Sequence, residues 1–65
     1  MYKNNMRIIR EEQGIRLSEL ANRTDISIGY LCHLERGTRK NPSIEIMDKI
    51  AIALNKSVFE VFFNE

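Results

Sequence analysis

Cys32 and His33 are the side chains of this sequence whose types most readily support chemistry, as metal ligands or as a nucleophile and its base. A tetrahedral metal site takes about four ligands, and the chain contains one cysteine and one histidine in all. Adjacent residues on a helix also point about 100° apart, so the imidazole would not be aimed at the sulfur. No glycine-rich phosphate loop, HExxH or serine-nucleophile motif is present. We therefore predict that the protein is not an enzyme and holds no metal and no cofactor.

The composition narrows the class of protein further. A chain of 65 residues has room for one small domain, which we expect to span residues 1–65. The single cysteine rules out an internal disulfide, and no apolar run reaches the length of a membrane span. These features predict a cytoplasmic protein with no membrane contact and no small-molecule ligand. Residues 1–40 hold eight Lys or Arg against five Asp or Glu, and residues 41–65 hold two against four, so one face can approach an anionic partner.

The apolar residues recur with helical periodicity, and no stretch alternates long enough to predict a strand. Five short helices are expected, at residues 4–13, 17–23 and 27–36, then after Ser43 and after Ser57. Ser43 is a good N-cap, and Ser57 with Glu60 forms a capping box. Gly14 and Gly37 are placed to end the first and third helices in a left-handed conformation. The predicted fold class is all-α, a compact arrangement of five helices.

Each predicted helix has an apolar side that can face a shared core. These sides are formed by Met6, Ile9, Leu17, Leu20, Ala21, Leu31, Leu34, Ile44, Met47, Ile50, Ala51, Leu54, Val58, Val61 and Phe62. The second and third helices are joined only by Thr24-Asp25-Ile26, and a turn of about three or four residues between two helices is typical of a helix-turn-helix. Asp25 stands where glycine is common, and Asp tolerates a left-handed conformation.

Several short motifs together resemble the Xre-type helix-turn-helix family, which includes the phage lambda-like repressors and Cro proteins. The motifs are Leu20-Ala21, Ile26-Ser27, Leu34-Glu35-Arg36-Gly37, Pro42-Ser43 and Ile50-Ala51 with Leu54, within a match over residues 6–63. The "ERG…NPSIE" segment is especially similar to the DNA-binding region of repressors of the SinR type. The resemblance implies a lambda-repressor-like, five-helix DNA-binding domain. Its third helix would enter the major groove of double-stranded DNA, with the protein bound as a homodimer to a palindromic operator.

The outward side of the third helix is unusually poor in charge. Helical geometry places Ile28, Gly29, Cys32, His33 and Arg36 away from the core. Isolated apolar residues are common on protein surfaces, and that is the alternative interpretation. The functional interpretation is a base-reading surface formed by Ile28, Gly29, Cys32 and His33. On this surface Ile28 would contact a thymine methyl and His33 would form a hydrogen bond with a base edge. Gly29 would allow close approach to the DNA.

Phosphate contacts are expected where helix starts and basic loops converge, because phosphates dominate DNA affinity. The candidates are Arg16, Ser18, Ser27, Tyr30, Arg36, Arg39, Lys40 and Asn41. The alternative for the loop charges is ordinary solubility. Many family members carry glutamine at the position of Leu17, where it holds the DNA backbone, and leucine cannot make that hydrogen bond. The family resemblance also implies a partly buried ion pair between Arg10 and Glu35, against the alternative of two unrelated surface charges.

Three phenylalanines in five residues exceed what one short helix can bury in so small a domain. Val58 and Phe62 share one side of the helix, and Phe59 and Phe63 share another. One set is expected to pack in the core and the other to form a self-complementary dimer surface, so all four are candidate interface residues. The alternative is that the core or the first helix absorbs them all.

The sequence therefore predicts a sequence-specific, double-stranded DNA-binding regulator of transcription. Repression is the expected mode, because so short a domain leaves no room for a sensing module. Within the same class, the chain could be a controller of a restriction-modification gene pair or an antitoxin component. From another class, it could be a protein-interaction module that has lost DNA binding, an alternative favoured by Leu17 and by the near-neutral charge.

Overall fold

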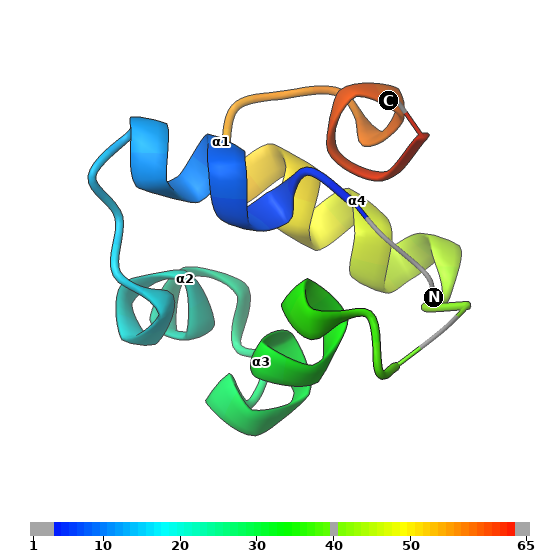
Figure 1. Cartoon of the computed structure of the whole chain (residues 1–65), viewed down its shortest axis with the longest axis horizontal. Helices are drawn as coiled ribbons and strands as arrows, with labels where there is room; N and C mark the ends of the chain where they lie inside the picture. The colour runs from blue at the N-terminus through cyan, green and yellow to red at the C-terminus, as the bar shows by residue number, and fades with distance from the viewer. Residues whose placement is uncertain (1–3, 40, 64–65) are drawn as a thin grey trace.

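The helices of the chain are short and pack at steep angles around one core (Figure 1). The computed structural model describes residues 4–39 and 41–63. Its elements are α1 (Met6–Glu12), α2 (Leu17–Thr24), α3 (Ile28–Arg36), α4 (Ile44–Ala53) and the π-helix η1 (Phe59–Phe63), with no strand in the described part. The helix α2 packs against both α3 and α4, and η1 packs against α1. The prediction of an all-α fold with five helices is confirmed.

Serine side chains cap the starts of three helical segments. The hydroxyl of Ser27 accepts from the Tyr30 N–H at 3.2 Å, and that of Ser43 accepts from the Ile46 N–H at 3.2 Å. At the last segment the capping box forms in both directions, since the Glu60 N–H donates to Ser57 at 3.0 Å and the Ser57 N–H donates to the Glu60 carboxylate at 2.9 Å. Both predicted caps are confirmed. Because Ser27 is the N-cap, α3 begins one residue later than predicted.

Left-handed residues close three of the helices as the sequence suggests. Gly14 has a φ of 69° just after α1, and Gly37 has a φ of 79° after α3. Asp25 ends α2 with a φ of 59° and a ψ of 30°. The short bend of the helix-turn-helix therefore has an aspartate at its left-handed position. Aspartate is one of the few residues besides glycine that adopt this conformation at modest cost.

The core takes side chains from every helix. Its fully buried members are Met6, Leu20, Leu31, Leu34, Ile50, Leu54 and Val61. The inclusion of Ile44 in the apolar stripe of α4 is wrong, because its side chain is 64% exposed. Ile44 lies in the first turn of α4, at the margin of the stripe, and Ile46 and Met47 pack against the core there instead.

The last segment differs from the predicted α-helix because Phe59–Phe63 form a wider π turn. In this turn two consecutive residues, Val61 and Phe62, both lie in the core. The segment is tied to the start of α1 by the Asn5 N–H, which donates to the Val61 carbonyl at 2.7 Å. The C-terminal helix therefore closes the core over α1 (Figure 1).

Candidate nucleic-acid interface

The inner side of α3 is fixed to the rest of the molecule. Leu31 and Leu34 are fully buried. Beside them the Arg10 guanidinium grips the Glu35 carboxylate through two hydrogen bonds, from Nε at 2.7 Å and from Nη2 at 3.2 Å, and its Nη1 donates to the Ile15 carbonyl at 2.8 Å. The two charged side chains are only 12% and 7% exposed, so the predicted buried ion pair is present. The hydrogen bond that Arg10 donates to the Glu35 carboxylate raises the pKa of Arg10 above its usual value, which keeps this guanidinium charged.

The outer side of α3 is open. Ile28 is 49% exposed, and Gly29, His33 and Arg36 are exposed beside it. Cys32 is half-buried, so it contributes an edge and not the centre of this surface. A Cβ at Gly29 would meet nothing within 4 Å. Nothing among the described residues therefore calls for glycine at this position, and a requirement for it would have to come from a partner.

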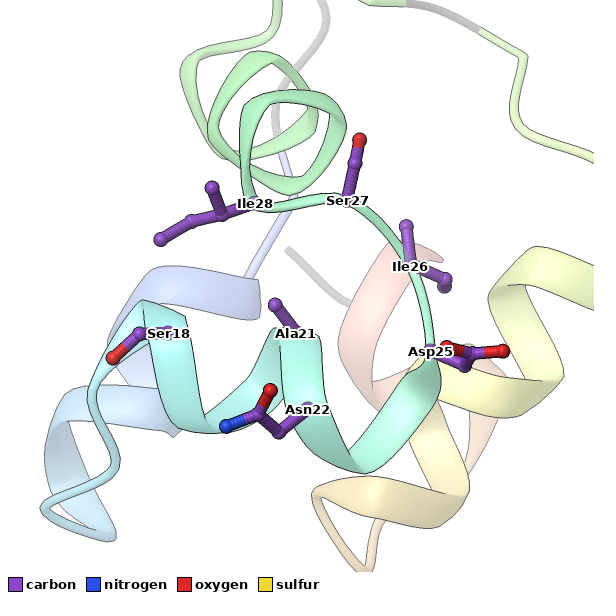
Figure 2. Close-up of a pocket in the computed structure, with 7 residues that line it drawn as sticks. All are labelled: Ser18, Ala21, Asn22, Asp25, Ile26, Ser27 and Ile28. Atoms are coloured by element: carbon purple, nitrogen blue, oxygen red, sulfur yellow. The ribbon is translucent and has the colours of Figure 1, made fainter.

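A shallow hollow separates α2 from the start of α3 (Figure 2). Its lining residues are Ser18, Ala21, Asn22, Asp25, Ile26, Ser27 and Ile28. The close-up shows Ser18 and Asn22 along α2 and Ile28 facing them from α3. Asn22 was not among the sequence candidates, although its position four residues after Ser18 places both on one side of a helix. The hollow brings together three predicted contact residues and adds a carboxamide that can donate to a phosphate or a base.

The start of α2 has no side-chain cap. Arg16 occupies the N-cap position in an extended conformation and makes no capping hydrogen bond. Free N–H groups at a helix start, together with an exposed arginine and Ser18, can bind a phosphate. Leu17 is half-buried and packs against the core, so it has a structural role here.

Tyr30, His33, Thr38 and Arg39 line a second hollow, at the other edge of the outer side of α3. The Arg39 guanidinium lies over the Tyr30 ring, 5.2 Å from its centroid, a cation–π contact that restrains the arginine. His33 Nδ1 lies 2.9 Å from the Thr38 hydroxyl. The structure thus gathers three predicted DNA-contact residues around Thr38. The sequence did not predict a role for Thr38, because this residue lies outside the helix.

The remaining loop candidates are only partly placed. Asn41 is exposed and left-handed, with a φ of 54°. Lys40 lies outside the described residues. Within the described part, no three His, Cys, Asp or Glu side chains gather where a metal ion could bind. None of the described helices is long and apolar enough to cross a membrane.

The four candidate interface residues of the C-terminal segment divide into two pairs. Phe59 and Phe63 are 62% and 56% exposed, whereas Phe62 is 4% exposed and Val58 packs half-buried against the core. This division agrees with the expectation that one pair packs in the core and the other stays at the surface, and it removes Phe62 from the candidate interface residues, because Phe62 has almost no exposed surface to offer a partner. Any dimer contact on this segment would rest on Phe59 and Phe63.

Comparison with known proteins agrees with this architecture. The family model described as helix-turn-helix matches residues 6–61, so the chain belongs to the helix-turn-helix family, and its resemblance to Xre-type proteins of the SinR type is confirmed. The N-terminal DNA-binding domain of SinR from Bacillus subtilis superimposes with a TM-score of 0.78 at 37% identity, over 83% of this chain and 78% of that chain. The lambda-repressor-like fold class is thereby confirmed.

The curated relatives are transcriptional regulators. The chain is 41% identical over 49 residues to the HTH-type transcriptional regulator SinR of Bacillus subtilis, a match that covers 75% of this chain and 44% of the relative. It is 43% identical over 49 residues to the transcriptional regulator ClgR of Mycobacterium tuberculosis, covering 75% of this chain and 43% of the relative. The chain therefore spans less than half the length of the curated relatives it matches.

Proposed function

We propose that the chain is a sequence-specific, double-stranded DNA-binding module of a transcriptional regulator. The observation that carries this proposal is the outer side of α3, where Ile28, Gly29 and His33 stand open on a helix whose inner side is locked by Leu31 and Leu34. A rigid helix with an exposed side that is poor in charge fits the width of a major groove. The helix-turn-helix family and its transcriptional relatives support the same function.

The proposed interface has a centre that reads bases and margins that hold phosphates. Ile28, Gly29 and His33, with Cys32 at their edge, would face the base pairs. On one margin lie the phosphate-binding candidates at the start of α2, Arg16 and Ser18, with Asn22 added by the structure. On the other margin lies Arg39, held over Tyr30. Phosphate contacts would fix the register of α3, and the base contacts would give specificity.

Repression by occupation of an operator is the mode we propose, since binding alone suffices for it. A homodimer would place two α3 helices in successive major grooves, about one helical turn apart on a palindromic site. Phe59 and Phe63 are the exposed aromatic pair available for such a contact. No chemical step is required of any residue in this function.

Selection from random duplexes, followed by a salt titration of affinity, tests the proposal. We expect an enriched sequence and a log–log salt slope several units steep, because each neutralised phosphate releases counterions. Replacing His33 by Ala should flatten the preference at one position in each half-site. Replacing Ile52, which is 78% exposed on α4, by Ala is the matched surface control and should change nothing. Absence of binding at low salt would refute the proposal and favour a protein-interaction module.

A further inference from the structure

His33, in the last turn of α3, is joined to Thr38 in the loop that follows. The Thr38 hydroxyl lies 2.9 Å from His33 Nδ1 and 3.2 Å from the His33 carbonyl oxygen. We propose that Thr38 is a positioning residue for base recognition, which holds the hydrogen of the neutral His33 ring on Nδ1 and leaves Nε2 as an acceptor toward the DNA. This proposal rests on the DNA-binding function proposed above and names the base edge that His33 reads, an amino group.

The contact with the carbonyl fixes the direction of both hydrogen bonds. A carbonyl oxygen can only accept, so the single hydrogen of the Thr38 hydroxyl points to the His33 carbonyl. The Thr38 backbone N–H donates to the same carbonyl at 3.1 Å, which holds the threonine against the end of α3. Because its hydrogen is engaged, the hydroxyl can only accept from the ring. His33 Nδ1 therefore carries the hydrogen and donates it to Thr38 at 2.9 Å.

The hydrogen bond at one ring nitrogen decides the state of the other. A neutral imidazole has one N–H donor and one acceptor nitrogen, so a hydrogen on Nδ1 leaves the lone pair on Nε2. The two nitrogens are separated by one carbon and point in widely divergent directions, so Nε2 is directed away from Thr38. His33 is exposed, and within residues 4–39 and 41–63 the hydrogen-bond partner of its ring is Thr38. Nε2 is therefore available to a partner.

An acceptor nitrogen selects bases that present a donor in the major groove. Cytosine presents its N4 amino group there and adenine its N6 amino group, whereas guanine presents the acceptors N7 and O6, and thymine presents the acceptor O4 and a methyl group. Nε2 of His33 would thus bond an amino group and would be repelled by the edges of guanine and thymine. Cytosine is the better fit, because adenine places its own acceptor N7 beside the amino group. The expected contact is with a cytosine at one position of each half-site.

The first test measures the tautomer in the free protein. The chain contains one histidine, so nitrogen NMR of the imidazole reports on His33 alone. At about pH 8, where a histidine side chain is mostly neutral, we expect the hydrogen on Nδ1 and an accepting Nε2. Thr38→Ser keeps the hydroxyl and should keep this pattern, whereas Thr38→Val should let the hydrogen occupy either nitrogen. A hydrogen found mainly on Nε2 of the wild-type chain would overturn the inference.

The second test identifies the base edge in the selected duplex. The position read by His33 is the base pair whose preference disappears in His33→Ala. We expect a C·G pair there, and since the preference alone does not show which strand is contacted, the atoms are probed directly. N4-methylcytosine carries a methyl group on the groove side of its amino group and should weaken wild-type binding, whereas 7-deazaguanine in the paired strand should not. Neither base analogue should change the binding of His33→Ala.

The Thr38 variants connect the tautomer to the base preference. Thr38→Ser should keep the preference for the C·G pair, and Thr38→Val should reduce it about twofold to tenfold, the range of one net hydrogen bond. If the pair is A·T, N6-methyladenine and 7-deazaadenine serve in the same two roles. Weakening by the deaza base alone, or an unchanged preference in Thr38→Val, would overturn the inference while leaving DNA binding intact. Absence of binding by the wild type would instead refute the proposed function, and this inference with it.

Discussion

The two sides of α3 differ in what holds them. On the inner side Leu31 and Leu34 are fully buried, and Glu35 is bound by two hydrogen bonds to Arg10. On the outer side a Cβ added at Gly29 would meet nothing within 4 Å, and the His33 ring lies 2.9 Å from the hydroxyl of the loop residue Thr38. One nine-residue helix thus presents one side to the core and the other to solvent. Substitutions on the inner side should change the free energy of unfolding, and those on the outer side should change DNA affinity.

Breaking the inner side should have the largest effect. Glu35→Ala leaves the Arg10 guanidinium buried without its partner, which we expect to lower the free energy of unfolding by about 3 kcal/mol. A chain of this size has a total free energy of unfolding of roughly 3 to 10 kcal/mol, so this loss is a large share of it. Because each kcal/mol lost shifts the melting temperature of a small domain by roughly 4 to 8 °C, the melting temperature should fall by roughly 12 to 24 °C. Thermal denaturation followed by circular dichroism measures both.

The exposed pair on α1 is the matched control for that variant. Arg7 and Glu11 bond at 3.2 Å with side chains 69% and 57% exposed. Because water screens such a pair, Glu11→Ala should change stability by no more than about 0.5 kcal/mol. Equal effects of Glu35→Ala and Glu11→Ala would show that burial of the Arg10–Glu35 pair contributes nothing.

Removing a charge from the outer margin should change binding and leave folding alone. Arg39→Ala deletes the guanidinium held over Tyr30. If this group binds a phosphate, the log–log salt slope should fall by about one unit and affinity should weaken for all sequences alike. Arg7→Ala removes the same charge from the exposed side of α1 and should leave the slope unchanged. A slope that both variants lower equally would mean that only net charge matters.

Gly29→Ala should raise the free energy of unfolding of the free chain and lower its affinity for DNA. Alanine favours a helix over glycine by roughly 0.5–1 kcal/mol, and its Cβ meets no atom within 4 Å, so the free chain should become slightly more stable. The same methyl group would lie where α3 approaches the bases, so affinity for the selected duplex should fall. Titration of that duplex into both proteins tests this, and unchanged affinity would remove Gly29 from the interface.

The smallest expected effect lies away from both sides of α3. The Ser57 N–H bonds the Glu60 carboxylate and lowers the pKa of Glu60 below its usual value. Because the pKa of Glu60 is lower in the folded state than in the unfolded state, the ionised carboxylate stabilises the fold above the unfolded-state pKa. This stabilisation is lost as pH falls through the folded-state pKa. Acid should therefore loosen η1 slightly in the wild type and less in Glu60→Gln. Equal acid sensitivity of the two proteins would show that this capping bond does not titrate.

Local signals in the sequence predict most of the fold. Ser43 and the Ser57–Glu60 pair cap helices as expected, and Asp25 adopts the left-handed bend that the short connection requires. These features depend on neighbours a few residues away. The π turn of η1 and the exposure of Ile44 were not predicted, because both depend on how helices distant in sequence share the core.

The site was predictable to the extent that helical periodicity determines it. Periodicity identified Ile28, Gly29 and His33 as an exposed group, and family resemblance supplied the Arg10–Glu35 pair. Thr38 and Asn22 were missed, since no periodic pattern connects a loop hydroxyl to a helical histidine or shows which side of α2 borders a hollow. Three-dimensional proximity was needed to find them.

Backbone NMR of the isotope-labelled chain, titrated with the duplex obtained by selection, tests the central claim most directly. We expect the largest amide shifts at Gly29, His33 and Thr38, on the outer side of α3 and its following loop, and smaller ones at Arg16 and Ser18. Leu31 and Leu34 should change least within α3. Shifts confined to Phe59–Phe63, with α3 unmoved at saturation, would contradict the account and assign binding to a different surface.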